Sequence, residues 1–128
     1  MKYETNLSAT ISVFHPSATS EAVETAMGLD AVRSISKGEY FNGKSGRRAD
    51  RTVAHFTVHE ECISDPEKSV DKCIELIREC DDVEVLRAAE VWVVIGLYSR
   101  DFVQLNLPAE LIAALEESGV GIAFENRA

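Results

Sequence analysis

The chain has 128 residues, of which 45% are hydrophobic and 27% are charged, a composition typical of one water-soluble globular domain. Its formal net charge of −9 disfavours general binding to nucleic acids or anionic membranes, because most of the surface would repel phosphate groups. No apolar run approaches the roughly 20 residues that span a bilayer, and residues 1–6 lack the apolar segment of a secretory signal. We therefore expect a cytoplasmic protein that folds as a single domain over residues 1–128.

Hydrophobic periodicity predicts a strand, a helix and a second strand in the first part of the chain. Residues 5–15 alternate between apolar and small polar side chains, as a half-buried strand does. Residues 17–27 place apolar side chains on one helical face, and Gly28 suits the left-handed position that ends a helix. A short strand over residues 31–36 then leads into a basic segment.

The middle of the chain predicts a strand followed by an amphipathic helix. Residues 52–59 alternate, with Ala54 and Phe56 on the side expected to face the core. Residues 64–80 begin with Ser-Asp-Pro-Glu, which is typical of a helix start, and continue with apolar residues at one-faced helical spacing. Residues 83–89 fit a strand or a helix equally well.

The last part of the chain predicts a central strand, a further strand, a helix and a final strand. Residues 91–98 are almost wholly apolar, which is typical of a strand inside a sheet. Residues 102–107 alternate and predict a strand after a short turn. Pro108 opens a helix that runs to near Gly119, and residues 120–124 predict the last strand. Three side chains of that helix are expected to point inward: Leu111, Ile112 and Leu115.

Together these elements predict an α+β fold built as a two-layer sandwich. The order is β-α-β repeated three times, which gives about six strands in a largely antiparallel or mixed sheet and three helices. Three helices cannot cover both faces of such a sheet, so we expect them on one face and a partly exposed sheet on the other. The exposed face is where a partner or a second subunit would dock.

One segment combines a nucleotide-binding consensus with nearly half of the positive charge. Residues 33–51 contain six basic and two acidic residues, against seven basic and twenty acidic residues elsewhere. Residues 38–45 match G-x-x-x-x-G-K-[ST], the loop that cradles phosphates. That loop requires a helix directly after its last residue, whereas residues 46–51 have no apolar helical stripe and run into a strand. We therefore interpret residues 37–51 as a basic, flexible loop joining two strands.

This basic loop still offers groups that could bind an anion. Its cationic side chains and one hydroxyl would donate charge-assisted hydrogen bonds to phosphate or carboxylate oxygens. The alternative is that these charges are simply solvated. The candidate anion-binding residues are Lys37, Lys44, Ser45, Arg47, Arg48 and Arg51.

No pattern in the sequence predicts catalysis, a cofactor or a metal site. His55 and His59 lie four residues apart on a predicted strand, roughly 13 Å from each other, which is too far to bind one ion. The three cysteines, at positions 62, 73 and 80, contain no C-x-x-C pair. The paired acids lie at element ends or on polar helix faces, where solvated charge is the norm. We expect a protein that is not an enzyme.

Two sets of residues predict a surface for a protein partner. The acids of the 64–80 helix and its end would attract a basic partner, unless they are merely solvated: Asp71, Glu75, Glu79 and Asp82. On the predicted 91–98 strand, Trp92 and Tyr98 share one side. If that side faces away from the helices, it forms an apolar patch together with Phe14, His55 and His59, as interfaces often do. The alternative is that the aromatic set packs in the core.

Several stretches resemble an uncharacterised bacterial family catalogued as domain of unknown function 4279. They are Met27-Gly-Leu-Asp-Ala-Val-Arg-Ser-Ile-Ser-Lys-Gly38, the segment from Leu105 through Pro108 to Gly119, and Gly121-Ile-Ala-Phe124. Where that family often opens its third strand with Trp, this chain has Thr52-Val53. The resemblance supplies no activity and no catalytic residues.

Some small acidic bacterial proteins of this kind resemble immunity proteins, which neutralise a toxin by binding it. We therefore expect a non-enzymatic binding protein without a nucleic-acid or membrane partner, and a basic, toxin-like protein as its most specific partner. The alternatives are a small-ligand or anion-binding protein that uses the basic loop, and a homodimer formed through the exposed sheet face.

Overall fold

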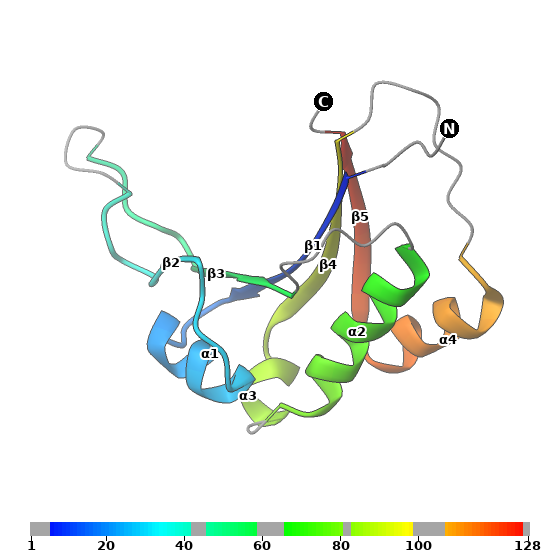
Figure 1. The fold of residues 1–128 in the computed structure, drawn as a ribbon. Coiled ribbons are helices and arrows are strands. Elements are labelled where there is room, and N and C mark those ends of the chain that lie inside the picture. Colours follow the sequence, from blue (N-terminus) through cyan, green and yellow to red (C-terminus); the bar gives the residue numbers. More distant parts are fainter. Residues whose placement is uncertain (1–5, 42–45, 59–65, 81–82, 99–106, 127–128) are drawn as a thin grey trace.

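The computed structural model describes residues 6–41, 46–58, 66–80, 83–98 and 107–126, and shows a five-stranded sheet with helices on one side of it (Figure 1). The expected α+β class and the expected mixed sheet are both confirmed. The strands are β1 (Asn6–His15), β2 (Arg33–Ile35), β3 (Thr52–Thr57), β4 (Glu90–Tyr98) and β5 (Val120–Asn126). The helices are α1 (Ser20–Met27), α2 (Pro66–Arg78), α3 (Val83–Arg87) and α4 (Ala109–Glu117).

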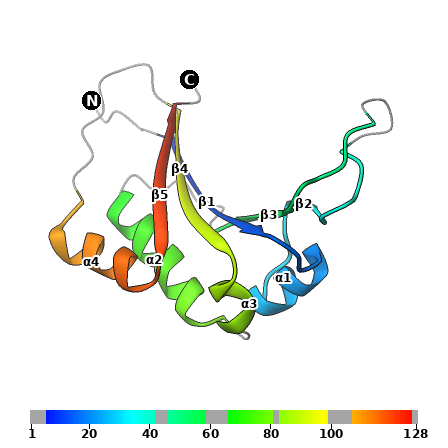
Figure 2. The ribbon, with the colours of Figure 1, turned by 180° about the vertical axis from the view of Figure 1, so that it is seen from behind.

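The strand order is β2-β3-β1-β4-β5, with β1 at the centre. β1 pairs antiparallel with β3 and with β4, and β2 pairs antiparallel with β3. β5 runs parallel to β4, and α4 makes the crossover between them. The view from behind shows the helices on the same side of the sheet (Figure 2). The other face has no helix over it in the described ranges.

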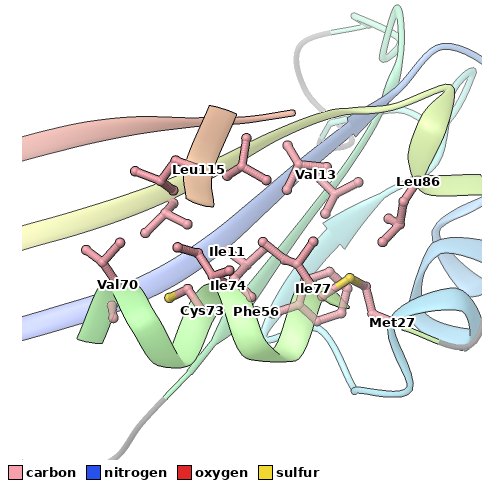
Figure 3. Close-up of a cluster of buried hydrophobic side chains, with 14 of the residues drawn as sticks. Ile11, Val13, Met27, Phe56, Val70, Cys73, Ile74, Ile77, Leu86 and Leu115 are labelled. Atoms are coloured by element: carbon pink, nitrogen blue, oxygen red, sulfur yellow. The ribbon is translucent and has the colours of Figure 1, made fainter. Parts of the chain in front are cut away.

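The hydrophobic core lies between the sheet and the helices (Figure 3). Ile11 is fully buried at the centre of β1, directly opposite Phe56 of β3 and Val93 of β4, which are also fully buried. α2 supplies the facing layer through side chains at helical spacing: Val70, Cys73, Ile74 and Ile77. The predicted period-2 pattern of β1 and the one-faced pattern of α2 are therefore both confirmed.

The ends of α1 follow the predicted signals. Thr19 Oγ1 accepts a hydrogen bond from the backbone N–H of Ala22 at 3.1 Å, which caps the first turn. Gly28 takes the left-handed conformation with φ 68°, and Leu29 folds back to pack against the core. A side chain at Gly28 would strain the backbone, so the residue type sets where the helix ends.

The structure differs from the expected elements at α3 and at Ile112, and it describes only the end of the expected sixth strand. Residues 102–106 of the expected sixth strand lie outside the described residues, and Leu107 is not in a strand. Residues 83–87 form α3, so the described chain has four helices where three were expected. The inward orientation expected for Ile112 is wrong, because its side chain is 52% exposed. α4 contacts the sheet at its margin through a narrow stripe, which buries Leu111 and Leu115 only.

No helix in the ranges that the structure describes is both long enough and apolar enough to cross a membrane.

The thiol of Cys73 is expected to be chemically inert in the folded protein. Burial raises its pKa to about 12, so almost no thiolate is present at mildly alkaline pH. Iodoacetamide should therefore leave Cys73 unmodified in the native protein and alkylate it fully in concentrated guanidinium chloride. Peptide mass spectrometry checks this. Rapid labelling under native conditions would contradict the packing of α2 on the sheet.

Candidate functional site

The face of the sheet turned away from the helices carries an aromatic and aliphatic cluster. Directly opposite residues in an antiparallel pair point to the same face. The register Phe14↔Val53, Ser12↔His55, Ser12↔Trp92 and Thr10↔Val94 therefore places these side chains together, on the face opposite to Ile11. We call the following set the outer-face patch: Ser12, Phe14, Val53, His55, Trp92 and Val94. Ser12 and Val94 are buried, and the other four side chains are partly buried. The structure thus selects the arrangement in which the Trp92 side of β4 faces away from the helices.

His55 lies on the β3 side of the outer-face patch, between Ser12 of β1 and Arg33 of β2. Its Nδ1 lies 2.8 Å from Ser12 Oγ, and the ring of Phe14 meets it edge-on with the centroids 6.4 Å apart. Burial lowers the pKa of His55 below 6.5, and Arg33 lowers it further, while Glu125 acts in the opposite direction. The imidazole is therefore neutral near neutral pH. It adds to an uncharged surface rather than supplying a positive charge.

Trp92 gives the patch a flat aromatic surface because its ring lies over Gly121 of β5. A Cβ atom at Gly121 would lie 2.6 Å from two carbons of the Trp92 ring, closer than van der Waals contact permits. The glycine is thus required for the ring to lie down across the neighbouring strand. Trp92 is half-buried, although no described helix covers it.

The patch has a charged border at the end of the sheet where β3 and β4 begin. The guanidinium carbon of Arg51 lies 4.3 Å from the centroid of the Phe14 ring, and its Nη1 lies 3.3 Å from Glu90 Oε2. Both charged side chains are more than half exposed, so this ion pair adds little to stability. Its effect is to shield the apolar centre with a polar rim, which is the usual anatomy of a protein interface.

The described part of the basic loop forms a two-stranded extension of the β2–β3 hairpin. It projects away from the helices (Figures 1 and 2). Backbone hydrogen bonds connect its two limbs: Gly38 N–H to Ala49 O at 2.9 Å, Ala49 N–H to Glu39 O at 2.8 Å and Phe41 N–H to Arg47 O at 3.1 Å. Residues 46–51 contain no helix, and β3 begins at Thr52. The described residues therefore agree with a strand-to-strand connection rather than a phosphate-binding loop.

The candidate anion-binding residues do not form one cluster of uncommitted cations. Arg48 stacks on Tyr40 with 4.9 Å from its guanidinium carbon to the ring centroid, and donates to the Tyr40 hydroxyl at 2.8 Å. Arg51 is engaged with Phe14 and Glu90. Lys37 and Arg47 are exposed on the two limbs. Lys44 and Ser45 lie outside the described residues.

The two predicted partner-binding sets lie on opposite sides of the protein. α2 packs on the helix side of the sheet and turns Asp71 and Glu75 to solvent, as does Glu79 directly after it, whereas Trp92 lies on the outer face. One surface cannot contain both. The exposed side of α2 also carries three basic residues, so its charge is mixed: Lys68, Lys72 and Arg78. Asp82 and the side chain of Tyr98 lie outside what the structure describes.

One hollow was not anticipated from the sequence. A cavity of about 630 Å³ opens between the ends of α2, α3 and α4, with Leu86 and Val91 in its apolar wall. Arg78 and Glu117, which lie 3.8 Å apart across it, make an exposed ion pair. Four elements meet there, and no sequence motif marks their junction.

Comparisons with known proteins add no functional assignment. No protein-family model, no curated protein and no solved structure matches this chain. The resemblance to the uncharacterised bacterial family therefore stays a prediction. Within the described residues, no group of three or more His, Cys, Asp or Glu side chains is placed to hold a metal ion.

Replacing Gly121 with Ala should destabilise the protein by about 1–3 kcal/mol, because the new methyl group overlaps the Trp92 ring. Urea denaturation monitored by Trp92 fluorescence measures the loss, since Trp92 is the one tryptophan in the chain. The matched control is the same substitution in a Trp92→Leu background, followed by circular dichroism, where the smaller side chain can move aside. An equal cost in both backgrounds would refute the contact.

The stability of the fold should fall as the pH drops below about 6.5 through protonation of His55. The folded-state pKa is lowered, so the unfolded chain binds the proton more readily and acid favours unfolding. Urea midpoints at several pH values, compared between the wild type and His55→Gln, isolate this residue from the other two histidines. The wild type should show the steeper decline. Parallel curves would contradict the assigned environment.

Proposed function

We propose that this protein is a non-enzymatic binding protein that engages a protein partner through its outer-face patch. The observation that supports the proposal is a cluster of aromatic and aliphatic side chains on a sheet face that no described helix covers. A partly exposed apolar patch with a polar rim is more typical of an interface than of free surface. Trp92 lies within it, and tryptophan is the residue most enriched among those that dominate binding energy.

The chemistry of the patch favours a partner with apolar side chains at the centre of its own surface. His55 is neutral near neutral pH, and Ser12 occupies its Nδ1, so the patch itself carries little charge, and Arg33 of β2 borders it. Arg51 and Glu90 at the border carry opposite charges that neutralise each other. A nucleic acid would require several free cations along a phosphate path, which the net charge of −9 opposes.

Neutralisation of a toxin-like protein in the cytoplasm is the most specific form of this proposal. The sequence suggested that acids on α2 would receive a basic partner. α2 together with Glu79, the residue after it, exposes three acidic and three basic side chains in the described part of the chain, so it provides a weaker electrostatic attraction than the acids alone suggested. We therefore assign the binding free energy to contacts of the outer-face patch. The charges of α2 would at most change the rate of association.

The test uses the purified chain as bait on an extract of the cells that express it, followed by titration of one purified partner in a calorimeter. Trp92→Ala and Val53→Asp should each weaken binding by at least about tenfold, because they remove buried contact area or place a charge within it. The paired reversal Asp71→Lys with Glu75→Lys serves as the matched surface control. It should change the affinity by less than about threefold.

Circular dichroism establishes that each variant is folded. If the α2 reversal abolishes binding while Trp92→Ala leaves it intact, the outer-face patch is not the interface. If none of the variants alters binding, neither surface is.

A further inference from the structure

The two edges of the sheet differ in how well they are protected from pairing with another strand. β2 is three residues long, exposes Arg33 and is followed by the basic loop. β5 is seven residues long, and in the described part of the chain it pairs only with β4. Its first five residues, Val-Gly-Ile-Ala-Phe, contain no charge and no proline. Natural proteins use short strands, charges or proline to protect an edge, and β5 has none of them over this stretch.

Exposed apolar side chains lie beside the β5 edge. Phe124 is 42% exposed and points to the helix side, because it lies opposite the fully buried Ile95. Ile112 of α4 is also more than half exposed. α4 faces α2 through Glu110, Leu111 and Ala114, which line a hollow together with Lys68 and Asp71 of α2, and through Glu117, which pairs with Arg78. Ile112 projects from the opposite flank of α4, at 100° per residue, and therefore faces the free edge.

We propose that this protein forms a symmetric dimer in which β5 pairs antiparallel with β5 of a second copy. The two sheets then join into one continuous sheet of ten strands. This proposal is independent of the outer-face patch, which stays open in the dimer.

The register that fits best places Ile122 on the two-fold axis. Val120 then lies opposite Phe124 of the second copy, and Gly121 lies opposite its Ala123, so that every pair in the centre is apolar. Glu125 lies opposite Gly119, so the two copies of Glu125 do not face each other. Since directly opposite residues point to the same face, both helix layers lie on one side of the joined sheet. The strand is thus complementary to itself in sequence as well as in backbone hydrogen bonding.

Analytical ultracentrifugation over nanomolar to micromolar concentrations tests the proposal on the whole chain. The wild type should sediment at twice the chain mass of 14.1 kDa. Ile112→Lys should weaken the dimer at least about tenfold, because a charge would be buried beside the joined strands. The matched control is Val32→Lys near the β2 edge. Val32 is an aliphatic residue that is 62% exposed, compared with 52% for Ile112. It should leave the dimer unchanged.

An Ile122→Cys variant locates the axis. In the proposed register the two Cα atoms at this position lie about 4.5–5.5 Å apart, within reach of a disulfide. Mild oxidation should join the copies through residue 122, as judged by disulfide-peptide mass spectrometry. Two results would overturn the proposal: a monomeric mass at every concentration, or a dimer that Trp92→Ala but not Ile112→Lys disrupts. If the protein is a monomer, hydrogen exchange tells why. Slow exchange at the β5 amides that do not bond to β4 would indicate that another segment, such as the strand predicted at 102–107, covers the edge.

Discussion

The pairing of β1 with both of its neighbours is the constraint on which the structure depends. Ile11 is buried against Phe56 on one side and Val93 on the other, and α2 closes the layer above them. A shift of one residue in either pairing would turn these side chains to solvent and bring Ser12 into the core. Burial of one face therefore fixes the register of three strands at once.

The same register creates the outer face. Because side chains alternate along a strand, fixing Ile11 inward sets Ser12 beside His55 and Trp92 on the opposite side. The hydrogen bond between Ser12 and His55 and the contact of Trp92 with Gly121 are thus consequences of core packing. No helix of the described ranges lies over this face, since the described helices that stabilise the sheet occupy its other side.

The basic loop shows why a short motif requires its structural context. Its glycines, lysine and serine satisfy a phosphate-binding pattern, yet the chain leads into β3 where that pattern requires a helix. The alternation of residues 52–57 carried this information, because a period of two excludes a helical start there. Arg48 and Arg51 are positioned by Tyr40 and Phe14, which the spacing of the basic residues did not reveal.

The sequence by itself determined the helices and strands of the described chain, apart from the choice at residues 83–87, because hydrophobic period and cap residues are local signals. It could not determine strand order or register, since these follow from contacts between residues far apart in the chain. Tertiary structure alone therefore decided that Trp92 faces outward, that the α2 acids lie on the other side and that Ile112 is exposed. The exposure of Ile112 has a clear cause: a helix at the margin of a sheet has a neighbour on one flank only, so it buries fewer of its apolar side chains than its pattern suggests.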